Sequence, residues 1–465
     1  MDGGASTQAL PRQTYDPAYD PLTYASPGGR IDYAPSYWIG TAGAPPEDDG
    51  PVDRDVDVDI AIIGSGFTGL SCAIHLAREH GVKATVLEAN GVAWGCSTRN
   101  GGQAQVSMGR LKRSQWIERW GFDVASAMHN EALDAFERFN ALIEDEDIDC
   151  EPQLGGHYYI AHKPSALPAM TAETTLFNER FGYGAKMIGR DELRAEHVND
   201  QESEGAMWEP HGTGVHAGKL AFGLQKVARR LGATVHVDSP VQGWTEANGV
   251  HHLRTPGGVV RARSVCVATG GYTSGELSPL TKDRLIPILS NSVATRVLTE
   301  AEQDACGFKV KSPLTDSRTL RHYYRLLPCG RVQIGSRSAI TGEGAPNPKY
   351  LQMLLDGLYR KFPALRGIAL DYSWWGWVDV SHDMMPRIFQ PDPAKSVFYA
   401  LGYGGNGVMY SSQAGRHLAR LAMGEDLGDL PIFTSPLPHY GVLTPFRRLG
   451  QRLSYVWYAM KDAQR

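Results

Sequence analysis

The chain has 465 residues, of which 42% are hydrophobic and 21% are charged. This composition is typical of a globular protein and excludes a disordered chain, a collagen-like fibre and a coiled coil. A chain of this length predicts two or three domains and buries enough surface to fold without a structural metal or a disulfide. The 46 Lys and Arg residues against 51 Asp and Glu residues give a net charge of −5, which argues against a nucleic-acid partner.

The six cysteines are widely separated and form no CxxC pair. The sequence therefore predicts no metal site, and scattered free thiols are typical of a reducing compartment. Residues 1–9 lack the basic and apolar regions of a signal peptide. No stretch approaches the ~20 consecutive apolar residues of a membrane-spanning helix. These observations favour a cytoplasmic location.

Residues 1–55 are rich in Pro, Gly, Asp and Tyr, a mixture that interrupts both helices and strands. We expect an irregular N-terminal arm. Its interleaved tyrosines and Trp38 favour an arm that lies over the body of the protein. A disordered leader is the alternative.

A βαβ unit is predicted directly after this arm. The apolar run over residues 58–63 is typical of a buried parallel strand. The spacing of apolar residues predicts a helix over 70–80 and a second strand over 84–87. Farther along the chain, the same helical spacing predicts helices over 123–143 and 220–231.

A GxGxxG sequence, formed by Gly64, Gly66 and Gly69, stands between the first strand and its helix. In such a turn the first glycine permits a tight bend, the second lets a pyrophosphate approach the backbone, and the third lets helix and strand pack closely. The phosphates would lie at the helix N-terminus, next to Phe67 and Thr68. The turn therefore predicts a dinucleotide site.

Glu88 closes the second strand, where a carboxylate accepts hydrogen bonds from an adenosine ribose and repels a 2′-phosphate. NAD and FAD share this pattern, and two later segments favour FAD. One is an apolar strand over 264–268 that runs into Thr269 and Gly270. The other is a glycine-rich loop over 400–408 before a further predicted helix, whose N-terminus would stabilise the electron-rich end of a reduced flavin.

Residues 93–103 read AWGCSTRNGGQ. This stretch resembles the glycine-alanine-serine-glycine-arginine-asparagine-glycine-glycine-glutamine element of the γ-glutamylputrescine oxidoreductase branch of the D-amino-acid oxidase (DAO) superfamily. Residues 316–325 resemble a strand of its substrate domain, and residues 405–408 resemble its last flavin loop, with Asn406 where histidine is common. The resemblance extends over about residues 30–460 and implies FAD as the cofactor.

The resemblance also implies the fold and its division. We expect an α/β protein with a Rossmann-like FAD-binding domain of the two-dinucleotide-binding-domain type, interleaved with an α+β substrate domain on a mainly antiparallel sheet. The expected segments are the arm at 1–55, the FAD-binding domain at 56–149, 211–275 and 395–440, the substrate domain at 150–210 and 276–394, and a C-terminal helix at 441–465.

Flavin-contacting residues are assigned by the same resemblance. Together with the first glycine turn and Glu88, they are Ser97, Thr98, Asn100, Gly101, Gly102, Gln103, Val241, Thr269, Gly270, Gly404, Gly405, Gly407 and Val408.

Five further residues are candidates for contact with the reacting atoms. Arg99 belongs to the RNGGQ element, and Tyr403 and Asn406 belong to the last flavin loop. Tyr323 and Arg325 share one face of a predicted strand because strand side chains alternate. If Arg325 faces the pocket, its guanidinium would pair with an acidic group of the substrate; a solvated strand arginine is the alternative.

The flavin is expected to be bound without a covalent link. Sarcosine oxidases of the superfamily carry a flavin-linking cysteine late in the substrate domain, and the matching stretch here, residues 374–379, has none. Cys96 stands where the family usually has alanine. We interpret it as a small buried residue; an unusual thiol near the flavin is the alternative.

The C-terminal segment from 445 to 465 has helical spacing, with Leu449, Leu453, Val456 and Met460 on one face. Four basic residues accompany them: Arg447, Arg448, Arg452 and Lys461. We expect a helix that packs its apolar face on the body of the protein. A helix that lies on a membrane surface or docks a partner subunit is the alternative.

The resemblance implies oxidation of a small amine or amino acid at the carbon that bears nitrogen. A hydride passes to flavin N5, and water hydrolyses the resulting imine to a carbonyl compound plus ammonia or an amine. O2 is the expected electron acceptor. Two alternatives stay open: the flavin subunit of an amine dehydrogenase, such as taurine dehydrogenase, that passes electrons to a partner or carrier, and a flavin-binding subunit without turnover.

Overall fold

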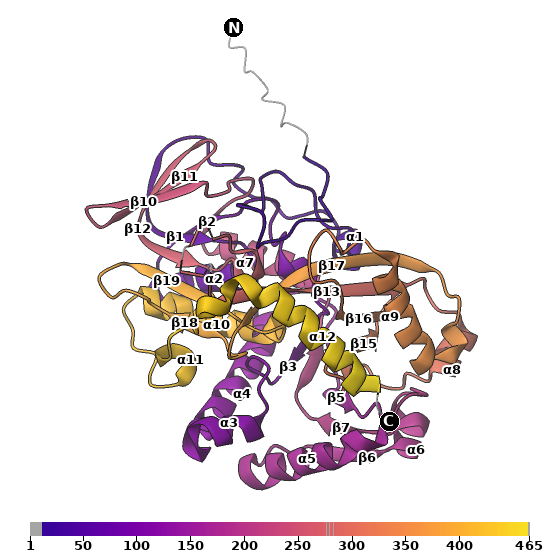
Figure 1. Ribbon diagram of the computed structural model, residues 1–465. Coiled ribbons are helices and arrows are strands. Elements are labelled where there is room, and N and C mark those ends of the chain that lie inside the picture. Colours follow the sequence, from indigo (N-terminus) through magenta and orange to yellow (C-terminus); the bar gives the residue numbers. More distant parts are fainter. Residues whose placement is uncertain (1–11, 276, 279, 282, 464–465) are drawn as a thin grey trace.

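The computed structural model describes residues 12–463 except 276, 279 and 282. Among these residues, the strands form two 8-stranded sheets and one 3-stranded sheet (Figure 1). No helix in this part of the chain is both long and apolar enough to cross a membrane. The α/β fold class expected from the sequence is confirmed.

The first sheet carries the predicted βαβ unit and is parallel at its centre. Its order is β10 (Gly243–Ala247), β11 (Val250–Thr255), β12 (Gly258–Val267), β1 (Val56–Ile63), β2 (Thr85–Leu87) and β9 (Thr234–His236), with β19 (Val397–Leu401) parallel to β12 and β18 (Arg387–Phe389) antiparallel to β19. The parallel strands β1, β2, β9, β12 and β19 therefore end at one edge, where ligands bind in such sheets.

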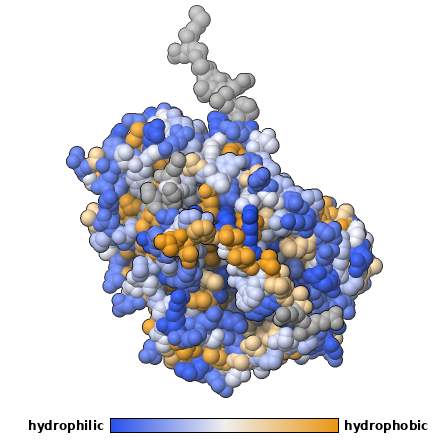
Figure 2. Space-filling view, viewed as in Figure 1, coloured by the Kyte–Doolittle hydropathy of each residue, from blue (hydrophilic) through white to orange (hydrophobic). Residues whose placement is uncertain are grey.

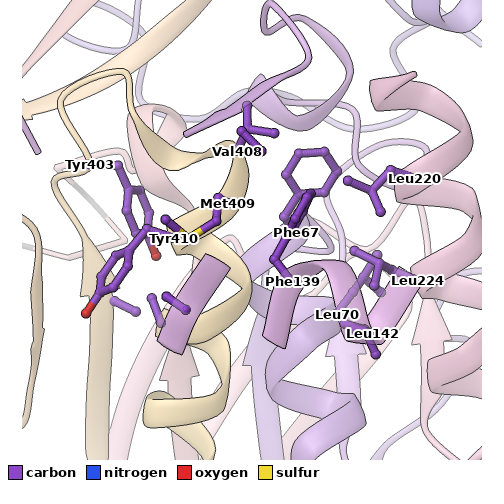
Figure 3. Close-up of a cluster of buried hydrophobic side chains, with 14 of the residues drawn as sticks. Phe67, Leu70, Phe139, Leu142, Leu220, Leu224, Tyr403, Val408, Met409 and Tyr410 are labelled. Atoms are coloured by element: carbon purple, nitrogen blue, oxygen red, sulfur yellow. The ribbon is translucent and has the colours of Figure 1, made fainter. Parts of the chain in front are cut away.

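A bundle of helices packs beside this sheet. It consists of α2 (Phe67–His80), α4 (Phe122–Asp145), α7 (Ala217–Arg230) and α10 (Gly407–Ala422), with α2 in contact with both α7 and α10. Figure 3 shows their side chains meeting in one apolar cluster, to which Phe67, Phe139, Leu220 and Met409 each come from a different helix. The helices predicted over 70–80, 123–143 and 220–231 correspond to α2, α4 and α7.

The second sheet is antiparallel except where β14 pairs with β5. Its order is β17 (Leu370–Ser381), β13 (Leu285–Thr295), β16 (Val332–Arg337), β15 (Tyr323–Leu326), β14 (Leu314–Asp316), β5 (His157–Ile160), β7 (Gly205–Glu209) and β6 (Lys186–Gly189). One sequence boundary differs here, because β18 lies within the expected substrate segment 276–394 yet pairs with β19 of the first sheet. The short connection from β18 to β19 favours this antiparallel hairpin.

The 3-stranded sheet consists of β3 (Gln103–Gln105), β8 (Gly212–Gly214) and β4 (Gln153–Leu154). The other α-helices of the described residues are α1 (Tyr37–Thr41), α3 (Arg113–Trp120), α5 (Leu167–Phe181), α6 (Arg190–Glu192), α8 (Glu300–Cys306), α9 (Pro348–Lys361), α11 (Pro431–Thr434) and α12 (Arg447–Ala463).

The described part of the N-terminal arm, residues 12–55, is packed on the body (Figure 1). Trp38 of α1 is fully buried, and its indole N–H donates to the Asn100 carbonyl at 2.7 Å. The Tyr19 ring stacks on Tyr272 with centroids 6.0 Å apart. The arm thus contains one short helix that its composition did not predict, because Ser36 caps it and tertiary contacts bury it. Residues 1–11 lie outside the described residues.

Candidate active site

One cavity connects the two large sheets. It begins at the carboxyl ends of β1, β2 and β12, where Ile63, Leu87 and Ala268 line it, and reaches the face of the second sheet at Tyr323 and Gly376. A site that joins a dinucleotide-binding edge to a separate sheet face can hold a cofactor and a small substrate together.

The first glycine turn lies at one end of this cavity. Gly64 adopts a φ of 102°, which only glycine adopts without strain. A Cβ on Gly69 would lie 1.9 Å from the Gly64 carbonyl oxygen, so glycine is required for α2 to pack on the strand end. α2 begins after Gly66 without a side-chain cap, and its first residues line the cavity. This open helix N-terminus fits a pyrophosphate.

Glu88 lines the cavity at the end of β2 and is 8% exposed. Its carboxylate accepts hydrogen bonds from the Ser65 hydroxyl at 2.7 Å and the Ser65 amide at 3.0 Å, and from the Asn90 amide at 3.2 Å. Burial raises the pKa of this carboxyl group. It makes no ion pair within the described residues, so its remaining acceptor capacity fits the hydroxyl donors of a ribose.

The RNGGQ element forms a tight turn on the cavity wall. The Asn100 side chain donates to the Ser97 carbonyl at 2.9 Å and accepts from the Gly102 amide at 2.7 Å, so it holds the turn together. Ser97 accepts from the Phe67 amide at 3.0 Å and ties this turn to α2. The Arg99 guanidinium lies 4.2 Å above the Trp94 ring and lines the cavity.

The last glycine loop closes the cavity opposite this turn. Gly404 and Gly405 have φ values of 65° and 93°. The Asn406 side chain donates to Ser107 Oγ at 3.0 Å and accepts from Gln105 at 3.3 Å. α10 begins at the next residue without a side-chain cap, which leaves a second helix N-terminus facing the cavity.

Tyr403 lies in the same loop and lines the cavity. Its hydroxyl is 2.8 Å from the Thr68 hydroxyl, a contact that connects the last loop to α2. Burial raises the pKa of Tyr403, so the hydroxyl is neutral at physiological pH. Tyr403 can therefore donate a hydrogen bond but cannot act as a base at neutral pH.

The two predicted residues of β15 have different surroundings. Tyr323 lines the cavity, and its hydroxyl lies 3.0 Å from Ser290 Oγ and 2.9 Å from Ser292 Oγ. Arg325 does not line the cavity. It is 1% exposed, and its guanidinium donates to the Val215 carbonyl at 2.6 Å and to Gln153 at 2.8 Å.

Both expectations for Arg325 were therefore wrong, since it neither faces a substrate nor meets solvent. The 3-stranded sheet covers its end of β15, and two glycines make room for the guanidinium. A Cβ on Gly214 would lie 2.1 Å from Arg325 Nη1, and one on Gly102 would lie 2.6 Å from Nη2. Arg325 is a buried structural cation.

Most other sequence-predicted residues line the same cavity: Gly64, Gly66, Phe67, Thr68, Glu88, Ser97, Arg99, Asn100, Gly101, Gln103, Val241, Thr269, Gly270, Tyr323, Tyr403, Gly405, Asn406, Gly407 and Val408. The cavity lining does not include Gly69, Thr98, Gly102, Arg325 or Gly404. Gly69 acts in packing, and the Thr98 hydroxyl donates to the Ala93 carbonyl at 2.9 Å.

Three arginines of the cavity wall were missed by sequence analysis: Arg110, Arg321 and Arg337. Arg110 and Arg337 lie outside the sequence elements identified above, whereas Arg321 lies within residues 316–325. Arg321 therefore carried a usable signal, since it stands two residues before Tyr323, although it precedes the strand β15 itself.

The expected non-covalent binding of FAD gives a direct prediction. Cys96 lines the cavity, and burial together with the nearby Asp379 charge raises the pKa of its thiol to about 12, so it is a weak nucleophile at neutral pH. Acid precipitation of the purified protein should therefore release the yellow flavin into the supernatant. A yellow pellet would contradict this, and repeating the assay with Cys96→Ala would show whether Cys96 makes the link.

Comparisons with known proteins agree with this geometry. The family model described as "FAD dependent oxidoreductase" (DAO) matches residues 59–421. Gamma-glutamylputrescine oxidoreductase of Escherichia coli is 29% identical over 425 residues, which are 88% of this chain and 94% of that protein. The probable oxidoreductase OrdL of Haemophilus influenzae is 27% identical over 383 residues, which are 81% of this chain and 85% of that protein.

The solved structure of glycine oxidase from Geobacillus kaustophilus superposes with a TM-score of 0.69 at 19% identity, over 82% of this chain and all of the other. This likeness confirms the fold. The match of the family model confirms the FAD cofactor and the oxidoreductase class expected from the sequence. With its glycine turn, its buried Glu88 and a family match over most of its length, the chain belongs to the DAO family of FAD-dependent oxidoreductases.

Proposed function

We propose that the protein oxidises a small amine or amino acid at the carbon that bears nitrogen and passes the electrons to O2. The cavity that connects the dinucleotide-binding edge to the face of the second sheet carries this proposal. The printed names of two similar proteins, gamma-glutamylputrescine oxidoreductase and glycine oxidase, support a nitrogen-bearing donor. The six cysteines are unpaired, which supports a cytoplasmic location.

Bound FAD would supply the two-electron acceptor for a hydride leaving that carbon. The donor thereby becomes an imine, and water hydrolyses it to a carbonyl compound plus ammonia or an amine. O2 takes up the two electrons and two protons as hydrogen peroxide, which balances the reaction.

The residues of the chain would bind and orient these partners. The N-terminus of α2 would hold the pyrophosphate and Glu88 the ribose. The N-terminus of α10 would stabilise negative charge on the ring system. Tyr323, fixed by two serines, would form the wall against which the donor lies. The chain needs no strong base if the amine enters in its neutral form.

Oxygen uptake by the holoenzyme tests this proposal. With the right amine, we expect one hydrogen peroxide and one carbonyl product for each O2 consumed. If the amine reduces the flavin but air restores its colour slowly, the acceptor is not O2 and the second candidate below is favoured.

The second candidate function is that of a flavin subunit that passes electrons to a partner protein. One observation favours it: α12 exposes its apolar face. Leu453 and Val456 are 65% and 60% exposed. The exposed set, here called the apolar band, is Val442, Leu443, Phe446, Leu449, Leu453, Val456, Trp457 and Met460. Figure 2 shows hydrophobic residues gathered where α12 crosses this face in Figure 1.

The expectation that α12 packs its apolar face inward was therefore wrong. The helix turns its polar face to the body instead. Arg448 donates to Asp20 of the arm at 2.8 Å, Gln451 is buried, and Asp462 accepts from the Thr319 amide at 2.9 Å. These contacts hold the helix down and leave the apolar band to face outward.

A protein partner fits this band better than a lipid surface does. Helices that lie on membranes are rich in exposed Lys and Arg. Here Arg447 and Arg448 donate to the Leu285 and Pro287 carbonyls at the body, so Arg452 and Lys461 supply the exposed positive charge of α12. An exposed apolar surface of this kind marks an interaction site.

The triple variant Leu449→Ser, Leu453→Ser, Val456→Ser tests the partner. We expect it to keep its FAD and its reduction by amine. We expect the natural chain to co-purify with an equal amount of a partner protein that speeds reoxidation of the reduced flavin. The triple variant should no longer bind this partner. Arg452→Ser on the same helix is the control. If the natural chain and the triple variant are reoxidised at the same rate, electron transfer to a protein partner through the apolar band is contradicted. Binding to phosphatidylglycerol vesicles that the triple variant loses would contradict it as well.

A further inference from the structure

Three arginine side chains meet at the substrate end of the cavity. Arg110 follows β3, Arg321 precedes β15 and Arg337 ends β16, and all three line the wall near Tyr323. Arg110 and Arg337 lie against the last glycine loop, since a Cβ on Gly404 would be 2.9 Å from Arg110 Cγ and one on Gly405 would be 2.7 Å from Arg337 Nη2.

None of the three makes an ion pair with a carboxylate among the described residues. The neighbouring Arg318 shows the contrast, because it pairs with both Asp316 and Glu202. The Nε of Arg321 is buried and has no hydrogen-bond partner within the same part of the chain. The Arg321 guanidinium lies 5.2 Å from the centre of the Tyr159 ring, a contact that supplies no counter-charge. Partly buried cations that lack an anionic partner cost folding free energy, so their gathering in a cleft indicates a ligand of opposite charge.

The three positive charges also act on one another. Burial, together with the charges of Arg337 and Arg321, lowers the pKa of Arg110 to about 9. Burial raises the pKa of Tyr455 of α12. The nearby positive charges of Arg337 and Arg110 act against this rise. The cluster thus lies near Tyr455 of α12.

Neither carboxylate of the cavity wall, Glu88 or Asp379, makes an ion pair with this cluster within the described residues. Glu88 lies at the dinucleotide end, beyond β2. Asp379 lines the cavity near the last glycine loop, as Arg110 and Arg337 do, but within the described residues it makes no ion pair with the cluster, and its carboxylate accepts from the Gly402 amide. A fourth arginine of the wall, Arg99, is not part of the cluster. Its guanidinium donates hydrogen bonds to the Trp94 carbonyl at 3.0 Å and to the Tyr15 hydroxyl at 3.2 Å.

We propose that the donor oxidised here carries two anionic groups, most simply two carboxylates, which Arg110, Arg321 and Arg337 bind. One carboxylate would satisfy one guanidinium fork and leave the other two without a counter-charge. The pyrophosphate of the cofactor is not counted as the missing anion, because it is assigned to the N-terminus of α2. The substrate class is thus an amine dicarboxylate or an amino acid with an acidic side chain. This inference rests on the proposed function.

Binding of ligands that cannot be oxidised tests the charge of the site without turnover. Malonate and succinate are titrated into the holoenzyme beside acetate and butyrate, and binding is followed by calorimetry and by the shift in the flavin spectrum. We expect a dicarboxylate to bind at least about tenfold more tightly than the monocarboxylates, the effect of one additional charge-assisted contact. Equal binding would overturn the inference.

Arginine variants locate that binding. Arg321→Met and Arg337→Met should each weaken dicarboxylate binding about tenfold or more, and Arg337→Lys should restore part of the loss in Arg337→Met because it keeps the charge without the fork. Arg331→Met is the matched control, since Arg331 pairs with Asp371 away from the cavity. FAD content shows whether each variant is folded. Unchanged dicarboxylate binding in the cavity variants would overturn the inference.

A turnover panel separates this inference from the proposed function. N-(carboxymethyl)glycine, aspartate and glutamate are compared with glycine, sarcosine and putrescine as reductants of the flavin without O2. Faster reduction by a monoanionic or cationic amine would overturn the inference and leave the proposed function intact. Arginine-dependent dicarboxylate binding without reduction by any amine would confirm a dianion site at the three arginines, but it would overturn the proposed function and with it the amine donor that the inference assigns to this site.

Discussion

Replacing Gly69 with alanine is expected to abolish FAD binding. The added Cβ would lie 1.9 Å from the Gly64 carbonyl oxygen and 3.2 Å from Ile62 Cγ2. The closest of these is a backbone atom, so no side-chain rotation relieves the clash, and α2 must move away from the end of β1. That movement displaces the open N-terminus of α2, which would bind the pyrophosphate. The expected result is a colourless protein.

The measurement is the flavin absorbance per chain after purification, with the melting temperature as a check on folding. Gly189→Ala is the control, because a Cβ there meets nothing within 4 Å and Gly189 has an ordinary φ of −69°. We expect the control to bind FAD fully. A Gly69→Ala protein with a full complement of FAD would show that the close packing of helix on strand is not needed for the site.

Replacing Lys361 with methionine is expected to cost about 3–5 kcal/mol of unfolding free energy, the usual result of breaking a buried ion pair. Lys361 ends α9 and is fully buried. Its ammonium lies 3.2 Å from Asp316, 3.3 Å from Glu202 and 3.5 Å from Asp200. Without it, Asp316 keeps Arg318 and Glu202 keeps Arg318 and Arg360, but Asp200 loses its ion pair, and the repulsion among the three carboxylates is less compensated.

The measurement is urea unfolding of the holoenzyme, with Lys349→Met, an exposed position on the same helix, as the control. The pH dependence gives an independent check. The pKa of Glu202 is lowered to about 2, chiefly by Lys361 and Arg318 acting against burial, and that of Asp316 is lowered well below its usual range.

A lowered carboxyl pKa stabilises the folded state above the unfolded pKa of about 4, and that stability is lost as the pH falls towards the folded pKa. The difference in unfolding free energy between the natural chain and Lys361→Met should therefore have its full value at about pH 6 to 8. It should shrink between about pH 4.5 and 2. An advantage that stays constant over this range would show that the loss comes from packing and not from charge.

Local patterns predicted the dinucleotide half of the molecule well. The strand, glycine turn, helix and Glu88 are adjacent in sequence, so the spacing of the residues determines their geometry. β1 and α2 extend two or three residues beyond their predicted starts, because tertiary packing continues the strand and helix past the apolar pattern.

The substrate half could not be predicted in the same way. Strand alternation placed Arg325 on the same face of the strand as Tyr323, but it could not predict how deeply Arg325 is buried. The 3-stranded sheet that covers Arg325 comes from three distant segments of the chain. Arg110, Arg321 and Arg337 likewise converge only through the pairing of β14, β15 and β16 and the turn after β3. Periodicity found the apolar face of α12, but its direction depends on the polar contacts beneath it.

The flavin absorbance under anaerobic conditions tests the central claim most directly. The holoenzyme is mixed with each amine of the panel, and dithionite serves as the control that the flavin can be reduced. We predict that an amine with two carboxylates bleaches the flavin completely and yields one carbonyl compound per FAD. A flavin that dithionite bleaches but no amine reduces, with or without a co-purifying partner, would contradict amine oxidation by this chain.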